Sequence, residues 1–391
     1  MFLKTHNRVE LLASSANYIE HLKSAIDSAC ECVFLETYIF ANDSAGNTIA
    51  QALQNAARRG VSVNVILDGF GAKNAEGDFA QAFQNAGVRL LFFRQEKSVF
   101  SFKRQRLRRL HSKLAIIDYK IAFVGGMNID ADPKGTTRLD FAAQIEGEVL
   151  TDIARHMLRQ WQNLRRAHGL KRDFFHCDFH AENCIAAEQS NAEVGFLIRD
   201  NFRHRHDILN SYLRAIESAK KEIIIANAYF LPGFWLSQAL LNAASRGVKI
   251  RIILQGKSNV PFLLSATRFL YQKLIQAGIE IYEYQPGLLH AKVAAIDERW
   301  LTIGSSNMDP FSLLLNKEAN ILVLSNILAK ELKKKLELTM ANDCVYYSAH
   351  APRRQSFLKR TVQALSFWMI RAILKLLHYN QSQWDDHQKR F

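Results

Sequence analysis

The chain of 391 residues is 48% hydrophobic, which gives it enough length and apolar surface for two or three domains with a large core. Its formal net charge of +14 indicates an anionic partner, and charge alone leaves nucleic acid and an acidic membrane surface both open. The 5 scattered cysteines favour a reducing compartment over a disulfide framework, while the polar N-terminus and the lack of an apolar run of about 18 residues argue against a secretory signal and a spanning anchor.

The residues before position 94 alternate between short apolar strands and amphipathic helices. Glycines close the helices, and the strands that follow are short and apolar. This alternation predicts an α/β domain with a largely parallel or mixed sheet. The expected elements are a strand and a helix over Asn7 to Ala29, a strand over Cys32 to Phe40, a helix over residues 46 to 59, a strand over Val61 to Leu67, a helix ending at Ala86-Gly87 and a strand over Val88 to Phe93.

A basic segment follows, between Arg94 and Leu110. Two aromatic residues, Phe100 and Phe102, are interleaved with its cations. Such a segment could hold lipid headgroups at an interface or stack on single-stranded nucleic acid, and a solvated surface loop is the plain alternative. Its seven cations, set against one Glu, are Arg94, Lys97, Lys103, Arg104, Arg106, Arg108 and Arg109.

The next segment reads His111-Ser-Lys113-Leu-Ala-Ile-Ile-Asp118, a His-x-Lys-x4-Asp pattern. In a strand, side chains two residues apart leave the same face, so His111 and Lys113 are expected to project together. Leu114 and Ile116 would anchor the opposite face in a core. A polar turn beginning at Asp118 and a second apolar run predict a hairpin.

The hairpin ends at Gly125-Gly126-Met127-Asn128, where glycine permits close approach of the backbone to a ligand. An imidazole, a fixed cation and an amide donor together suit a phosphodiester. Histidine attacks or shuttles protons near neutral pH, while lysine and asparagine stabilise charge on phosphoryl oxygens. One copy of the pattern alone would be weak evidence for a catalytic site.

Residues 165 to 192 join this part of the chain to a second. The cluster from His176 to Cys184 invites a zinc site, but its spacing fits no closed ligand set, so we expect no metal there. The segment that follows, Arg199-Asp200-Asn201 to Arg205, could contact a headgroup or cap the next helix.

The second part of the chain repeats the order of the first. Residues 223–230 match the region from Tyr38 to Phe40, and Gly247-Val248 and Gly278-Ile279 match Gly60-Val61 and Gly87-Val88. The chain is therefore interpreted as an internal duplication.

The motif returns in the second part as His290-Ala-Lys292-Val-Ala-Ala-Ile-Asp297, followed at the same spacing by Gly304-Ser305-Ser306-Asn307. Chance does not readily repeat His, Lys, Asp, Gly and Asn at matching offsets. An ancestral homodimer fused into one chain would face the two hairpins across a pseudo-twofold axis and build one active site from both. Two independent domains with two sites are the alternative.

The residues from about Tyr346 onward lie outside the duplication. Basic residues punctuate a run of aliphatic and aromatic side chains, and the longest uncharged stretch, Thr361 to Ile370, is too short to cross a bilayer. This composition suits a basic amphipathic helix lying in an anionic interface. A helix packed on the protein's own core is the alternative.

With both motif copies intact, the chain resembles the phospholipase D superfamily and, within it, the bacterial cardiolipin synthases, most closely the B type, from about residue 8 to residue 345. The resemblance implies an α/β fold of two tandem phospholipase D-like repeats, each a mixed sheet flanked by helices, related by a pseudo-twofold axis and followed by a C-terminal amphipathic helical tail. The expected domains are residues 1–170 with the motif at 111–128, residues 171–345 with the motif at 290–307, and residues 346–391.

The resemblance also implies roles for residues. Asn128 and Asn307 would bind the substrate phosphate together with the two lysines. The family pattern places a carboxylate downstream of each motif to orient an active-site histidine, which points to Asp140 and Glu318, unless these are ordinary surface charges. The implied catalytic residues are His111, Lys113, Asp118, His290, Lys292 and Asp297, with the two aspartates expected to support the site rather than touch substrate.

The implied reaction transfers a phosphatidyl group from one phosphatidylglycerol to another and releases glycerol. One histidine attacks phosphorus to give a phosphohistidine, and the other protonates glycerol and later deprotonates the acceptor hydroxyl. His111 is favoured as the nucleophile by analogy with relatives. No metal or other cofactor is implied.

The implied partners are anionic phospholipids such as phosphatidylglycerol and the membrane surface, and nucleic acid is not expected. The protein would lie peripherally on the cytoplasmic side of the cell membrane, and the sequence leaves its oligomeric state open. Three alternatives share the motif: a phospholipase D hydrolase with water as acceptor, a nucleic-acid phosphodiesterase, and a non-catalytic lipid- or nucleic-acid-binding relative. The last would be expected to carry a broken motif.

Overall fold

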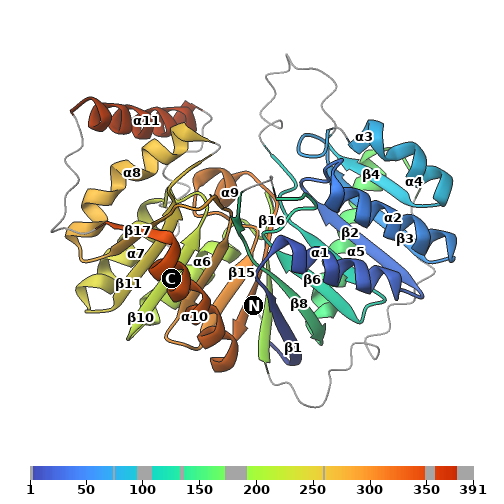
Figure 1. The fold of residues 1–391 in the computed structure, drawn as a ribbon, viewed down its shortest axis with the longest axis horizontal. Helices are drawn as coiled ribbons and strands as arrows, with labels where there is room; N and C mark the ends of the chain where they lie inside the picture. Colours follow the sequence, from blue (N-terminus) through green and yellow to red (C-terminus); the bar gives the residue numbers. More distant parts are fainter. Residues whose placement is uncertain are drawn as a thin grey trace.

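A single 15-stranded mixed sheet forms the centre of the molecule, in the order β17-β12-β11-β10-β14-β15-β16-β9-β1-β8-β6-β5-β2-β3-β4. This order reads nearly the same outward from the β9-β1 contact in both directions, so the duplication seen in the sequence is present in the topology (Figure 1). The computed structural model describes residues 3–73, 75–94, 108–132, 136–171, 192–258, 260–347 and 357–376.

The first half of the sheet alternates with helices as the sequence predicts. Helix α2 begins at the N-cap Asp43, whose side chain accepts a hydrogen bond from the N–H of Gly46. The strands of this half are β1 (Lys4–Leu12), β2 (Cys32–Thr37), β3 (Ser62–Asp68), β4 (Arg89–Phe93), β5 (Leu114–Ile117), β6 (Ile121–Gly125) and β8 (Ala142–Gly147), and its helices are α1 (Ser15–Asp27), α2 (Ser44–Arg58), α3 (Ala75–Asp78), α4 (Ala80–Ala86) and α5 (Leu150–Ala167).

The second half repeats this pattern of strands and helices. Parallel pairing of β10, β11 and β12 matches that of β2, β3 and β4 in the first half. The strands of this half are β9 (Ala192–Arg199), β10 (Glu222–Asn227), β11 (Lys249–Gln255), β12 (Glu280–Tyr284), β14 (Lys292–Ile296), β15 (Trp300–Gly304), β16 (Glu318–Leu324) and β17 (Cys344–Tyr347), and its helices are α6 (Asp207–Ser218), α7 (Phe234–Ser245), α8 (Pro261–Gln276), α9 (Pro310–Leu314) and α10 (Asn326–Asp343).

The two half-sheets pack against each other through an apolar core that both share. Strand β6 contacts β15 and β16 although the sheet order separates them, so the contact runs across the inner faces. Ile116 and Val124 from the first half and Ile303 and Ile321 from the second belong to one buried cluster, together with residues of α5 and α10. Two further clusters cover the outer faces, one beneath α1, α2 and α4 and one beneath α6, α7 and α8. Burial of this size is the main stabilising contribution to the fold.

Each motif forms the expected hairpin, β5-β6 and β14-β15. Asp118 and Asp297 occupy the turns with φ of 50° and 51°, a left-handed conformation that disfavours residues other than glycine. Each carboxylate accepts hydrogen bonds from three successive backbone N–H groups at the start of the neighbouring strand, those of residues 30–32 for Asp118 and of residues 220–222 for Asp297. These charge-assisted bonds offset the turn strain and fix the hairpins to the central strands.

The C-terminal helix α11 (Phe357–Leu376) packs along α8 (Figure 1). The sequence left open whether this segment packs on the protein or lies in an interface. In the structure, one face of the helix packs on the protein. None of the helices within the described ranges is long and apolar enough to cross a membrane. The α/β fold class expected from the sequence is confirmed.

Candidate active site

The two motif segments are held by backbone pairing with the opposite half. The N–H groups of His111 and Ser112 both donate to the carbonyl of Lys317, at 2.9 and 3.1 Å, and the N–H of Lys317 donates back to Arg109. The sequence predicted that His111 and Lys113 lie within a strand, but β5 begins only at Leu114. The prediction was wrong there because the preceding residues pair with the second half instead of with β2.

The second motif is held in the same way by the first half. Strand β13 (Leu288–Leu289) pairs in parallel with β7 (Arg138–Leu139), and the N–H of His290 donates to the carbonyl of Leu139 at 2.8 Å. Each motif histidine therefore sits beside the segment of the other half that carries a downstream carboxylate. The two halves are thus joined at the site by short segments of backbone pairing.

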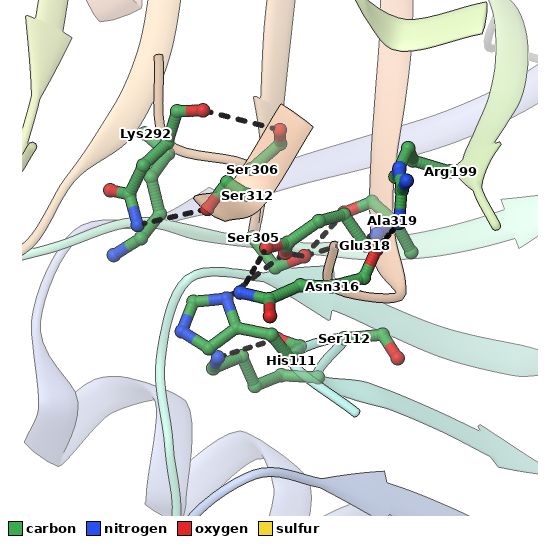
Figure 2. A network of polar contacts seen from close by, with 12 residues as sticks. His111, Ser112, Arg199, Lys292, Ser305, Ser306, Ser312, Asn316, Glu318 and Ala319 are labelled. Atoms are coloured by element: carbon green, nitrogen blue, oxygen red, sulfur yellow. Dashed lines mark hydrogen bonds and ion pairs between the residues drawn. The ribbon is translucent and has the colours of Figure 1, made fainter. Parts of the chain in front are cut away.

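The His111 ring contacts Glu318 of the second half. Its Nδ1 lies 3.0 Å from Oε2 of Glu318, whose side chain is fully buried, while the His111 side chain is about one-eighth exposed. Two other residues of the second half hold the same carboxylate: Ser305 donates to Oε2 at 2.5 Å and Asn316 donates to Oε1 at 3.4 Å. Figure 2 shows Ser305, Glu318 and Asn316 gathered around the ring.

The His290 ring contacts Asp140 of the first half, with 2.6 Å between Nδ1 and Oδ2. The other carboxylate oxygen of Asp140 accepts the N–H of Phe141 at 2.8 Å. Gly126 leaves room for this carboxylate, since a Cβ on that glycine would lie 2.3 Å from Oδ1. Each carboxylate expected to orient a histidine thus contacts an imidazole, but the imidazole belongs to the other half.

The protonation of each pair follows from burial and from its partner. Burial alone raises the pKa of Glu318, but His111, Lys113 and the Ser305 hydroxyl together bring that pKa below its ordinary value. Burial likewise opposes ionisation of Asp140, and His290 and Lys292 hold its pKa low. Because both carboxylates are ionised, each Nδ1 carries a proton and each Nε2 is directed away from its carboxylate.

Burial lowers the pKa of both imidazoles against the opposing effect of their carboxylates. The nearby lysines lower it further, Lys113 and Lys292 each acting on both histidines. The rings are therefore neutral, the form in which Nε2 keeps a lone pair. Mutual influence of both lysines on both histidines indicates that the two motifs form one site.

The two lysines are buried cations. The Nζ of Lys113 donates to the carbonyl of His111, and Lys292 bonds the carbonyl of His290 in the same way. Burial, together with repulsion from Lys292, lowers the pKa of Lys113 to about 7, and burial lowers that of Lys292 to about 8. An anionic ligand in this site would restore the protonated state of both.

The two asparagines that follow the motifs are buried in different ways. Asn128 accepts the N–H of Ile39 through Oδ1 at 3.3 Å. Asn307 donates through Nδ2 to Ser312 at 3.4 Å, and its Oδ1 has no hydrogen-bond partner among the described residues. Asp118 and Asp297, in contrast, lie in the turns at the far ends of the hairpins and do not approach the histidines.

Sequence reasoning missed several residues that shape the site. Tyr38 packs against His111 with 5.1 Å between ring centroids, and Lys113 lies 5.4 Å from the centre of the same ring. Arg199 donates to the carbonyls of Leu314 and Asn316 and so holds the loop that leads into Glu318. The sequence singled out the segment beginning at Arg199 without deriving its role, and no local pattern marked Tyr38.

Glu36 and Ser112 form a second buried contact behind the first motif. Ser112 donates to Glu36, which is fully buried, and burial raises the pKa of Glu36 to about 7. This pair supports the backbone next to His111.

Two predicted features cannot be placed. Most of the basic segment, residues 95–107, and the cluster from His176 to Cys184 lie outside the described residues. Within the part that is described, no group of three or more His, Cys, Asp and Glu side chains is arranged to hold a metal ion.

Comparison with known proteins identifies the family. The chain matches the family described as cardiolipin synthase, PLD-like domain, over residues 22–164 and 212–340. It is 34% identical over 369 residues to cardiolipin synthase B of Escherichia coli strain K12, covering 93% of this chain and 88% of that protein. It is also 29% identical over 341 residues to cardiolipin synthase 1 of Staphylococcus epidermidis, covering 86% of this chain and 68% of the relative.

Among solved structures, the phosphatidylserine synthase of Haemophilus influenzae Rd KW20 superposes with a TM-score of 0.70 over 93% of both chains. Its sequence identity of 14% makes this a likeness of fold alone. The family match and the curated relatives confirm the resemblance stated from the duplicated motif. This chain belongs to the cardiolipin synthase, PLD-like family and is an enzyme of the phospholipase D superfamily.

Proposed function

We propose that this protein is a cardiolipin synthase that joins two phosphatidylglycerol molecules and releases glycerol. The observation that carries the proposal is the pair of imidazole-carboxylate contacts, His111 with Glu318 and His290 with Asp140, built across the two halves around two buried lysines. Such an arrangement supplies a nucleophile, a proton carrier and a cationic cradle for one phosphodiester. The curated relatives named cardiolipin synthase support the choice of substrate.

In the first step, Nε2 of His111 attacks the phosphorus of one phosphatidylglycerol. Glu318 holds Nδ1–H and stabilises the positive charge that the ring gains as the N–P bond forms. The bond from phosphorus to the glycerol oxygen breaks, and His290 gives that oxygen a proton. The products of this step are a phosphatidyl-histidine and free glycerol.

The proton on His290 comes with substrate binding. Burial and Lys292 lower the pKa of this imidazole to about 3. A phosphodiester anion beside the ring favours its charged form and raises that pKa, so His290 takes up a proton as the lipid enters. The same anion keeps Lys113 and Lys292 charged, and each such donor lowers the barrier by stabilising the phosphoryl oxygens, an effect worth about 100- to 1,000-fold in rate.

In the second step, neutral His290 removes a proton from a hydroxyl of a second phosphatidylglycerol. The resulting oxygen attacks phosphorus, the N–P bond to His111 breaks, and cardiolipin leaves. Hydrolysis differs only in the acceptor, since water attacking the same intermediate would give phosphatidic acid. Water must therefore be kept from the intermediate while a lipid hydroxyl is admitted.

The substrates are membrane lipids, so we infer that the protein works as a peripheral protein at the membrane. The net charge of +14 favours a surface rich in phosphatidylglycerol. We assign the cytoplasmic side from the sparse cysteines, which suit a reducing compartment.

The test is to incubate purified protein with phosphatidylglycerol vesicles without added metal and to resolve the products by mass spectrometry. Cardiolipin and glycerol in equal amounts are the expected result. Phosphatidic acid as the main product would make the protein a hydrolase. Cleavage of single-stranded DNA with no lipid turnover would overturn the proposal altogether.

A matched control separates the enzyme from contaminating activity. The His111→Ala variant, prepared identically, should give neither cardiolipin nor phosphatidic acid. Glycerol labelled in the headgroup should be released by the wild-type protein alone.

A further inference from the structure

Helix α11 has one face against the protein and one face open. On the packed face, Ile370 and Ser366 are buried, and Phe367 lies 4.8 Å from Phe269 of α8 between ring centroids. On the open face a stripe of large apolar side chains continues for most of the helix. These exposed residues are Leu358, Val362, Leu365, Trp368, Met369 and Ile373.

The charge on α11 is all of one sign. Its sequence contains Lys359, Arg360, Arg371 and Lys375 and no acidic residue. Arg371 lies over the rings of Phe367 and Trp368, at 5.4 and 5.9 Å. A helix with an open apolar face flanked only by cations has the chemistry of one that lies in an anionic lipid interface.

Helix α11 borders the active site through a short chain of contacts. Ile370 belongs to a small buried apolar cluster with Leu231, and Tyr229 packs against this cluster. Tyr229 is close enough to Tyr38 to raise its pKa, and Tyr38 packs on His111. Through its packed face, helix α11 is therefore linked to the residues beside His111.

Other exposed aromatic residues lie at this same edge of the sheet. Phe70 lies two residues after Asp68, the last residue of β3, and Asp68 accepts the N–H of Leu110 beside His111. Phe202, which is 78% exposed, follows Arg199 and the contacts that hold the Glu318 loop.

Phe234, also exposed, begins α7 three residues after Leu231, whose N–H donates to Met308 next to Asn307. Figure 1 shows α3, α9 and α11 along one edge of the molecule. The exposed aromatic residues after β3, β9 and β10 all follow strand ends at that edge.

We propose that this edge is a bilayer-docking surface, in which the open face of α11 inserts among anionic lipids and Phe70, Phe202 and Phe234 contact the same leaflet. The proposal deepens the proposed function, on which it rests for the choice of phosphatidylglycerol. It explains how a site buried between two halves receives a lipid: the headgroup rises only a short way while the acyl chains stay in the leaflet. It also limits water near the phosphatidyl-histidine.

The opposite edge supplies a matched control. Ile327 is 81% exposed at the start of α10, beside Ser325, whose N–H donates to Arg299 in the turn of the second hairpin. It is as apolar and as open as the residues of α11 but lies at the far ends of the motif strands. An acidic substitution there changes the net charge equally without touching the proposed surface.

The experiment measures binding of the full chain to vesicles by co-sedimentation, with phosphatidylglycerol in phosphatidylcholine and with phosphatidylcholine alone. Leu365→Glu and Trp368→Glu are each expected to weaken binding to the anionic vesicles roughly ten- to hundredfold, because a large apolar side chain leaves the lipid and a like charge enters. Ile327→Glu is expected to bind like the wild type. Lipids with brominated acyl chains should quench part of the tryptophan fluorescence of the bound wild-type protein. That quenched part should be missing in Trp368→Phe.

Equal loss of binding in Ile327→Glu and Leu365→Glu would overturn the proposal, because net charge alone would then explain it. A change of molar mass in solution caused by Leu365→Glu, with vesicle binding intact, would also overturn it and make the face a contact between copies of the chain. Binding is read without turnover, so failure of the proposed reaction leaves this test valid. Activity on short-chain phosphatidylglycerol dispersed as monomers should stay within about twofold of wild type in Leu365→Glu.

Discussion

The two imidazole-carboxylate pairs occupy equivalent places in the duplicated fold, yet they are supported differently. His111 has a Tyr38 ring against it, whereas the strand pairing gives His290 an Ala228 at the matching position. Glu318 accepts hydrogen bonds from two side chains besides His111, while Asp140 accepts one from a backbone N–H. The duplication conserved the arrangement of the site and let its surroundings diverge.

The length of each acidic side chain is matched to the small residue that lies beside its carboxylate. Gly126 lacks a Cβ where the Asp140 carboxylate lies, whereas the equivalent Ser305 points a hydroxyl at Glu318. A longer acid with a side-chain donor thus serves His111, and a shorter acid with a glycine serves His290. We take this difference to mean that the two histidines have separate tasks, one covalent and one in proton transfer.

The largest effect is expected from removing either ring. His111→Ala and His290→Ala should each lower turnover by about 1,000,000-fold, because the nucleophile and the proton carrier belong to one site. Half of the activity remaining in either variant would mean two independent sites. Product formation on phosphatidylglycerol vesicles is the measurement, with thermal unfolding to verify the fold.

The two carboxamide variants should differ from each other. In Asp140→Asn, the amide oxygen stays on the N–H of Phe141, so the NH2 group faces His290, forces the wrong tautomer and lowers kcat by about 10,000-fold. In Glu318→Gln, the amide oxygen can still face His111 and Ser305, and the loss should be about 100-fold or less. Equal losses measured under saturating lipid would contradict the separate roles.

Ser305→Ala should act through the pKa of Glu318. The serine hydroxyl lowers that pKa, so removing it raises the pKa, and the carboxylate then needs a higher pH to ionise. The acidic limb of the kcat profile is expected to move to higher pH, with a loss of about tenfold at neutral pH. Ser306→Ala, at the adjacent buried residue, is the control and should leave the limb in place.

The smallest effect is expected at Tyr38. Tyr38→Ala makes the first half resemble the second at this position and removes the ring that packs on His111, which should lower kcat about two- to tenfold. Tyr38→Phe keeps the ring and should remain close to wild type. A loss in Tyr38→Phe as large as in Tyr38→Ala would show that the hydroxyl, not the packing, matters.

The sequence predicted the elements of the fold well because their signals are local. Apolar periodicity and helix-closing glycines placed the second helix at residues 46–59, against Ser44–Arg58 in the structure. The repeated motif correctly predicted both hairpins. Leu114 and Ile116 are buried in the shared core as the alternation required.

The sequence could not predict the crossing of the halves, in which each carboxylate contacts the histidine of the other half. Asp140 follows the His111 motif in the chain but contacts His290, and this choice depends on how two faces dock rather than on any local pattern. For the same reason the backbone of His111 pairs with Lys317 and the strand begins later than predicted. A role for Ser305 could have been suspected from the sequence, because the matching residue in the first motif is Gly126. This is the position where the two small-residue pairs differ.

The crossing also sets when the protein becomes active during its synthesis. His111 and Glu318 are 207 residues apart, so a ribosome adding about 5–20 residues per second completes the pair about 10–40 s after the histidine is made. Until then, His111 of the nascent chain has no carboxylate partner, and no residue of the second half covers it. A partly translated or truncated chain is thereby silent toward the lipids around it, and activity begins only when both halves have docked.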